Sequence, residues 1–195
     1  MEHDILTKLH ACREGALFAS RYPSIREAWD ACERPDWLLW FAGRRLTGEG
    51  DSRTFVRISI DVARLAMPLF ERHVPKDMRV RDCIEVTQRW LDGKATAVDA
   101  RAAADAAADA AYAARADTYA AVYAADAAAD AAYAARAAAY AAYAADAAAC
   151  AADAASCAAD AAAYAVAAAC DAHVSYADAK IKCCKIIRQY IPVCT

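Results

Sequence analysis

Residues 105–121 read DAAADAAYAARADTYAA and residues 126–142 read DAAADAAYAARAAAYAA, so the second half of the chain repeats itself at an offset of 21 residues. Alanine fills most positions of the repeat, and alanine has the highest helix propensity of any residue. The interrupting residues are mainly Asp, Tyr and Arg, and they recur about every 3.5 positions, close to the helical period. The repeat therefore predicts helices that carry a stripe of Asp, Tyr and Arg along one face.

The alanine-rich tract is too long to be one helix of a compact domain. No Gly or Pro occurs from Thr96 to Ile191, and a single straight helix over that stretch would be about 140 Å long. A domain of this size is far more compact. We therefore expect the tract to break into several helices, because Asp, Ser and Thr can begin a new helix. The candidate breaks are Asp117-Thr118, Ser156-Cys157 and His173-Val174-Ser175.

The first 94 residues have the composition of ordinary globular helices. The sequence Ser24-Ile25-Arg26-Glu27 is a capping box, Asp36 is a candidate N-cap, and Gly93 is a candidate helix terminator. Residues 47–51 predict a loop, and Pro68 predicts a kink. The expected fold is all-α: a bundle of short helices (1–94), followed by long, closely packed alanine-rich helices and a basic C-terminal helix (95–195), packed as one domain.

Composition and charge exclude several classes of protein. The net charge of −3 and the pI of about 5.8 argue against a nucleic-acid binder, which usually carries a basic surface. Nine cysteines, an odd number, follow a polar start without a signal peptide, which indicates reduced thiols in a cytoplasmic protein. Charged residues or tyrosines interrupt every apolar run, so we expect no membrane span.

Motifs for catalysis and metal binding are absent from the sequence. The four histidines form no His-x-x-x-His pair, the cysteines form no Cys-x-x-Cys pair, and the five glycines form no phosphate-binding loop. The Asp pairs of the repeat lack the histidines of a di-iron bundle. We therefore expect a protein that is not an enzyme and that has no catalytic residues, metal or cofactor.

The stripe of the repeat has two interpretations. In the first, the stripe has no binding role: it is exposed to solvent, or its tyrosines pack on the first half of the chain. In the second, it is a recognition surface, since Tyr and Arg dominate binding hot spots. Residues 99–172 contain ten Asp and three Arg, whereas the tail from His173 has a balance of +3, so the tail helix is also expected to fold back on the stripe. The candidate binding residues are Asp105, Tyr112, Arg115, Tyr119, Asp126, Tyr133, Arg136 and Tyr140.

Three segments together resemble the Imm-5-like immunity proteins of bacterial polymorphic-toxin loci and phage or prophage genomes. The first runs from Ile25 to Cys32 and continues as Asp36-Trp37-Leu38-Leu39-Trp40, and the second covers 57–72 and 84–93. The third is the alanine-rich tract with its charged closing helix at 180–190. The resemblance implies an all-α fold, a role in neutralising a partner protein and a place in a bacterial cell or phage-infected host.

Three functions follow as competing hypotheses. The leading one is a binding protein that neutralises a partner protein, a toxin or a defence component, because an acidic face attracts a basic partner. The second is a sponge for a nucleotide signal of bacterial defence, because Arg115 and Arg136 lie near tyrosines that can stack on a base. The third is a structural homodimer, because alanine faces can pack closely.

Overall fold

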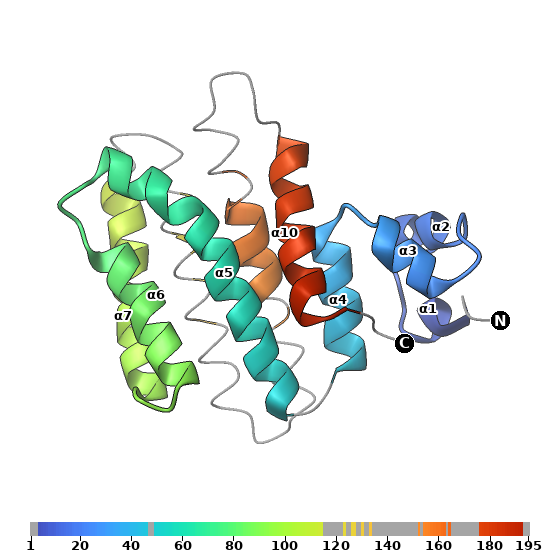
Figure 1. Ribbon diagram of the computed structural model, residues 1–195, viewed down its shortest axis with the longest axis horizontal. Coiled ribbons are helices and arrows are strands. Elements are labelled where there is room, and N and C mark those ends of the chain that lie inside the picture. The colour runs from blue at the N-terminus through green and yellow to red at the C-terminus, as the bar shows by residue number, and fades with distance from the viewer. Residues whose placement is uncertain are drawn as a thin grey trace.

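The computed structural model describes residues 4–46, 49–114, 123, 126–127, 130, 133, 152, 154–162, 164 and 176–192. All regular structure within these residues is helical, which confirms the predicted all-α fold. Figure 1 shows the helices α4, α5, α6, α7 and α10 packed side by side, with three short helices at one end. The helices are α1 (Asp4–Lys8), α2 (Arg13–Ala19), α3 (Ile25–Ala31), α4 (Pro35–Arg45), α5 (Glu49–His73), α6 (Arg79–Leu91), α7 (Ala97–Ala114) and α10 (Tyr176–Tyr190).

Capping side chains and one glycine set several helix ends. The predicted capping box at α3 is confirmed, since the Glu27 amide donates to Ser24 Oγ over 3.2 Å. A second box opens α7, where the Asp99 amide donates to Thr96 Oγ1 over 3.2 Å and the Thr96 amide donates to Asp99 Oδ2 over 2.8 Å. Gly93, at φ 73°, closes α6 as predicted. Two hydrogen bonds, from the Gly93 amide to Trp90 O and from the Lys94 amide to Arg89 O, complete a Schellman motif.

Four local predictions are wrong. Asp36 is not the N-cap of α4, because Pro35 opens that helix and Asp36 in its first turn pairs with Arg34 instead. The expected loop at 47–51 does not extend past residue 48, since α5 already begins at Glu49. That helix has 25 residues and contains Pro68, so it is not one of the short helices expected here. The break expected at Ser156-Cys157 falls inside a helical run over 154–162, whereas 117–118 and 173–175 lie outside the described residues.

Helix α5 lies at the centre of the hydrophobic core. Its contacts reach α6 on one side and α10 on the other. Residues from several of its faces are at most 1% exposed, including Phe55, Ile58, Val62 and Phe70. Arg57, Arg64 and Arg72 lie on the exposed stripe of α5, and the wide apolar face opposite this stripe packs against the helices on either side.

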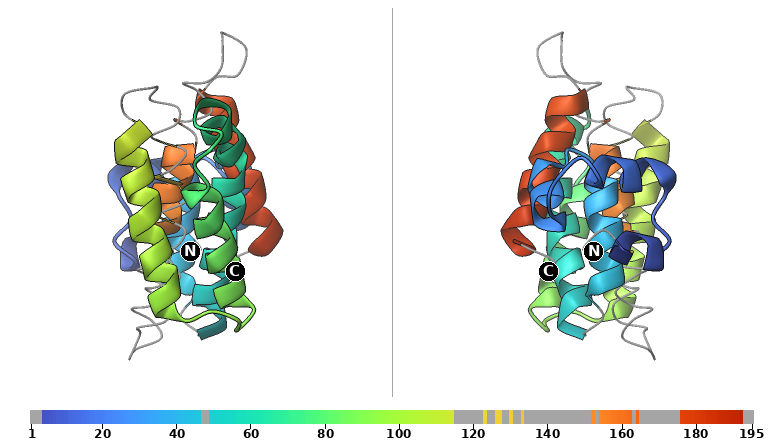
Figure 2. Two further views of the ribbon diagram at one scale, coloured as in Figure 1. Left: turned by 90° about the vertical axis from the view of Figure 1, so that its left-hand side faces the viewer. Right: turned by 90° about the vertical axis from the view of Figure 1, so that its right-hand side faces the viewer.

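The alanine-rich tract packs into the same core. The small side chains of Ala100, Ala104, Ala107 and Ala110 are at most 1% exposed and recur at helical spacing on α7, which packs against α6. The helical run over 154–162 lies inside the bundle in both Figure 1 and Figure 2, with Ala155, Ala158 and Ala159 fully buried. One hydrophobic cluster therefore includes residues from both sides of residue 94.

Helix α10 ties the end of the chain to its beginning. The guanidinium of Arg188 donates to the carbonyl oxygen of Trp29 over 2.7 Å and also to that of Cys32. These carbonyls belong to the last turn and the C-cap of α3, and Trp29 O also accepts a hydrogen bond from the Cys32 amide over 3.3 Å. The Tyr190 hydroxyl donates to the carboxylate of Asp61 on α5. These contacts hold α10 against the N-terminal helices and α5.

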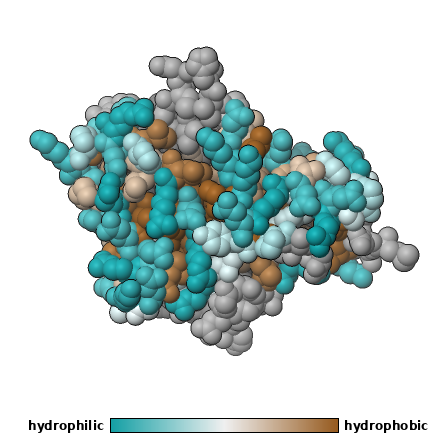
Figure 3. All heavy atoms as spheres, in the orientation of Figure 1, coloured by the Kyte–Doolittle hydropathy of each residue, from teal (hydrophilic) through white to brown (hydrophobic). Residues whose placement is uncertain are grey.

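The visible surface is mostly polar. On the face drawn in Figure 3, hydrophilic side chains cover the helices, and hydrophobic residues show between them over α5 and α6. Within the described part of the chain, none of the helices combines the length and apolarity needed to span a bilayer.

Candidate functional site

Only part of the predicted recognition stripe lies in the described residues. The structure describes Asp105, Asp126 and Tyr133 with their side chains, and it places the backbone of Tyr112 in the last turns of α7. The other four predicted residues lie outside the described part: Arg115, Tyr119, Arg136 and Tyr140. The site is therefore built from Asp105, Asp126 and Tyr133, with the stripe residues Asp109 and Asp130 that accompany them.

The two copies of the repeat meet through a tyrosine and a carboxylate. Tyr133 of the second copy donates its hydroxyl hydrogen to Asp105 Oδ1 of the first copy over 3.4 Å. Asp105 lies on the outer side of α7, and Arg101 Nε approaches its Oδ2 to 3.8 Å. Both carboxylate oxygens of this exposed residue therefore face a donor. The contact places residues 28 positions apart in the sequence on one surface.

Asp126 and Asp130 form a partly desolvated pair. Both side chains are half-buried, and they lie four residues apart, which places them on the same face of a helix. Burial raises the pKa of Asp130 to about 7, and the negative charge of Asp126 contributes to the same rise. Near neutral pH, Asp130 is therefore divided between its neutral and its charged form.

These five residues, Asp105, Asp109, Asp126, Asp130 and Tyr133, are called the acidic face below. Asp105 and Asp109 are exposed on α7, whereas the three residues of the second copy are half-buried. The ring of Tyr133 packs against the hydrophobic core. The described stripe is thus neither wholly solvated nor wholly packed, and the contact between Tyr133 and Asp105 joins its two copies.

Tyrosines elsewhere in the stripe pack against one another. The rings of Tyr123 and Tyr164 lie with their centroids 5.3 Å apart at an interplanar angle of 31°. Tyr123 is half-buried against the core, whereas Tyr164 is 47% exposed. This pair joins Tyr123, just before the second copy of the repeat, to Tyr164, just after the helical run over 154–162, and it leaves one aromatic ring partly exposed at the surface.

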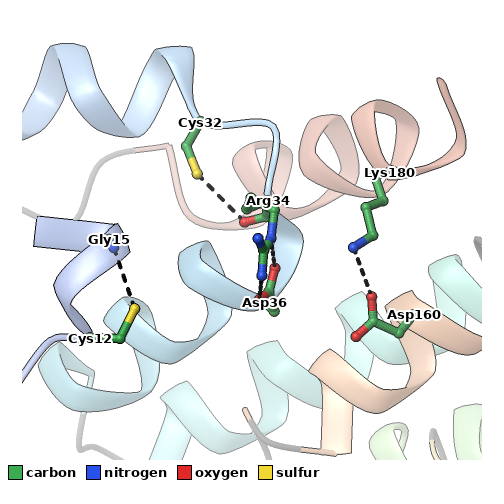
Figure 4. Close-up of polar contacts among 7 residues, drawn as sticks. All are labelled: Cys12, Gly15, Cys32, Arg34, Asp36, Asp160 and Lys180. Atoms are coloured by element: carbon green, nitrogen blue, oxygen red, sulfur yellow. Dashed lines mark hydrogen bonds and ion pairs between the residues drawn. The ribbon is translucent and has the colours of Figure 1, made fainter. Parts of the chain in front are cut away.

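The basic tail folds back on the acidic stripe at one described position. Lys180 Nζ of α10 lies 3.4 Å from Asp160 Oδ1, and the side chain of Lys180 is only 15% exposed. Figure 4 shows this ion pair beside the pair formed by Arg34 and Asp36, at the start of α4. The pair therefore fixes the position of α10 against the helical run over 154–162.

Asp36 is held by two hydrogen bonds from one guanidinium. Arg34 Nε donates to Oδ1 over 2.9 Å and Nη2 donates to Oδ2 over 2.6 Å, as drawn in Figure 4. Burial alone would raise the pKa of Asp36, but the hydrogen bonds and charge of Arg34, with the charge of Lys180, lower it below its usual value. Asp36 is therefore an anion that already has its counter-ion.

The thiols of the core are not activated. Burial raises the pKa of Cys83, Cys183 and Cys184 to about 12, so each stays a neutral thiol at physiological pH. Within the described residues, no group of three or more His, Cys, Asp and Glu side chains is placed to hold a metal ion.

Two features of this region do not follow from the sequence pattern. The spacing of Asp126 and Asp130 is the same as that of Asp105 and Asp109, so it does not indicate that the second pair is half-buried. The charge pattern predicts that the basic tail meets the stripe, but it does not indicate that the ion pair of Lys180 forms with Asp160. The seven-residue spacing of Asp146, Asp153 and Asp160 would have pointed to one helical face, but not to the element that packs on it.

Comparison with protein-family models, with curated proteins and with solved structures finds no match to this chain.

Proposed function

We propose that this protein is a non-catalytic binding protein that captures and neutralises a basic partner protein through the acidic face of its alanine-rich tract. The observation that carries the proposal is the half-buried carboxylate pair Asp126 and Asp130, beside the contact between Tyr133 and Asp105. This role is also the one that the resemblance to Imm-5-like immunity proteins implies.

The pair Asp126 and Asp130 has an electrostatic reason to accept a cation. Burial and the negative charge of Asp126 both destabilise the charged form of Asp130. A Lys or Arg side chain of a partner relieves that repulsion and restores the charged form of Asp130. The free energy released on binding is then larger than for two solvated carboxylates.

The exposed part of the acidic face acts earlier, while the partner approaches. Asp105 and Asp109 stand on the outer side of α7, where their charges reach into solvent over about one Debye length, 8–10 Å. Exposed charges of this kind raise the rate of association with an oppositely charged protein. Tyr133 adds an amphipathic ring of the type that anchors interfaces.

The test is retention of a partner by immobilised protein, from lysate of cells that express its neighbouring genes, with identification by mass spectrometry. The face variant carries Asp105→Asn, Asp109→Asn and Asp126→Asn. The matched control carries Glu33→Gln, Asp82→Asn and Glu85→Gln, three exposed carboxylates of other surfaces, so both variants have the same net charge. Circular dichroism verifies that all samples keep their helices.

We expect one stoichiometric basic partner that the wild type and the control retain, and that the face variant retains about tenfold less. Binding is also expected to be about tenfold weaker at pH 6 than at pH 8, because a proton must leave Asp130 before it pairs with a cation. Equal retention by the two variants, or no partner at all from folded protein, would contradict the proposal.

A further inference from the structure

The N-terminal helices line a cavity that is open to solvent on one side and that the acidic face does not use. Its volume is about 450 Å³, and α1–α4 supply most of its lining, with Ser156 of the tract at one side. Pockets for small molecules typically measure about 300–1,000 Å³. The lining is dominated by aromatic rings: Phe18, Trp29, Trp37, Trp40 and Phe41.

The aromatic rings are held in place by their neighbours. Phe18 packs on Trp37 with ring centroids 5.7 Å apart, and Trp29 packs on Phe41 with centroids 6.1 Å apart, both at tilted angles. The guanidinium of Arg34 covers the ring of Trp37 at 4.6 Å from its centroid. A preformed aromatic wall favours a planar ligand, since offset and tilted ring contacts stabilise such a complex beyond the area they bury.

One polar group of the lining lacks a hydrogen-bond partner. Trp29 is 4% exposed, and its indole N–H meets no acceptor in the described part of the chain. A buried donor without an acceptor costs about 1–3 kcal/mol, so buried N–H groups are nearly always satisfied. A bound molecule that presents an oxygen or ring nitrogen would supply the acceptor.

The charges of the lining disfavour an anionic ligand. Lysine and arginine are absent from the described lining, His10 is its one basic side chain, and its one carboxylate, Asp36, is neutralised by the two hydrogen bonds from Arg34. A phosphate or carboxylate would therefore lose its water without meeting a lysine or arginine, which is costly. A cationic ligand would have to compete with Arg34 for Asp36.

We infer that this cavity binds a neutral, planar aromatic molecule that carries a hydrogen-bond acceptor for the indole N–H of Trp29. The rings of Trp37 and Phe18 contact the ligand, and the acceptor fixes its orientation. The inference stands independently of the acidic face, because the two sites share no residue.

The test uses two neutral bicyclic probes, coumarin, which has a carbonyl acceptor, and naphthalene, which has none. Binding is followed by tryptophan fluorescence and calorimetry on the full chain. Ala28→Leu fills the cavity, because Ala28 lines it and is 5% exposed, whereas Ala31→Leu adds the same bulk on the exposed side of α3. If Ala28→Leu does not fold, Ala11→Leu, at another position of the lining, replaces it.

We expect wild type and Ala31→Leu to bind coumarin, and the filled variant to lose binding at least tenfold. Trp29→Phe, which removes the N–H, should weaken the binding of coumarin about five- to tenfold. The affinity for naphthalene should stay within about twofold of the wild-type value, because only coumarin accepts a hydrogen bond from this donor. Absence of coumarin binding to folded wild type, or equal binding by both leucine variants, would overturn the site. An equal effect of Trp29→Phe on both probes would overturn the role of the acceptor.

Discussion

The two copies of the repeat contain the same residues in different surroundings. Asp105 and Asp109 of the first copy stand exposed on α7, whereas their equivalents 21 residues later, Asp126 and Asp130, are half-buried. Ala106 is half-buried, and its equivalent Ala127 is fully buried. Residues 105–116 are identical to residues 126–137, so the sequence within the copies does not cause these differences, and they arise from what surrounds each copy.

The two copies present their carboxylates in two different environments. The copy on the outside of the bundle offers solvated charge, which acts at long range. The copy nearer the core offers desolvated charge, which interacts strongly over a short range, because the effective dielectric constant falls with burial. A repeat placed at two depths thus provides both kinds of carboxylate.

The largest expected effect comes from adding bulk at the equivalent alanines. Ala127→Leu should lower the free energy of unfolding by about 3 kcal/mol, because three extra carbons must enter a site that has no exposed surface. Ala106→Leu should change it by about 0.5 kcal/mol or less, since part of that side chain can reach solvent. Urea denaturation measures both. Equal losses would show that the two copies are packed alike.

A second comparison uses the pH dependence of stability. The pKa of Asp130 is raised to about 7 in the folded state, so the native protein holds a proton that the unfolded chain has lost above about pH 4. The wild type should therefore lose stability relative to Asp130→Asn as the pH rises from 5 to 7, by about 2 kcal/mol, and the difference should level off above 7.

Asp109→Asn, the equivalent change in the exposed copy, is the control for this prediction. It should leave the difference in unfolding free energy between pH 5 and pH 8 unchanged to within about 0.5 kcal/mol, as for most surface substitutions. Denaturation at the two pH values measures both variants. A pH-independent difference between wild type and Asp130→Asn would show that the carboxyl group of Asp130 is solvated.

The smallest expected effect concerns the contact between the copies. Tyr133→Phe removes the hydroxyl that donates to Asp105 over 3.4 Å, and at this length and exposure the loss should be about 0.5 kcal/mol. A double-mutant cycle with Asp105→Asn isolates the contribution of the contact. A coupling free energy indistinguishable from zero would mean that the contact does not hold the two copies together.

Sequence patterns predicted the elements whose causes are local. The box at Ser24 and the glycine at residue 93 act within one turn of the chain, and both occur as expected. The N-cap at Asp36 failed because Arg34, two residues earlier, pairs with its carboxylate. The break at Ser156-Cys157 failed because the run lies buried in the bundle, where tertiary packing outweighs the weak helix-breaking tendency of serine.

The candidate sites depend on contacts that no local pattern specifies. The stripe identified Asp126 and Tyr133 as members of one helical face, but the depth of Asp130 depends on the packing of the whole tract. The cavity exists because the rings of Trp29, Trp37 and Phe18 leave space between them, which depends on how their helices pack. Their concentration in the first half of the sequence indicates a core, and it does not indicate whether that core is filled.

The proposed function depends on a half-buried carboxylate with a raised pKa, that of Asp130 in the second copy of the repeat. The direct measurement is a carbon-13 NMR titration of the aspartate side-chain carboxyl signals, with the Asp130 signal assigned by its loss in Asp130→Asn. We expect a midpoint near 7 for Asp130. A midpoint near 4, the ordinary value for an aspartate, would show that the pair is solvated and would contradict the claim.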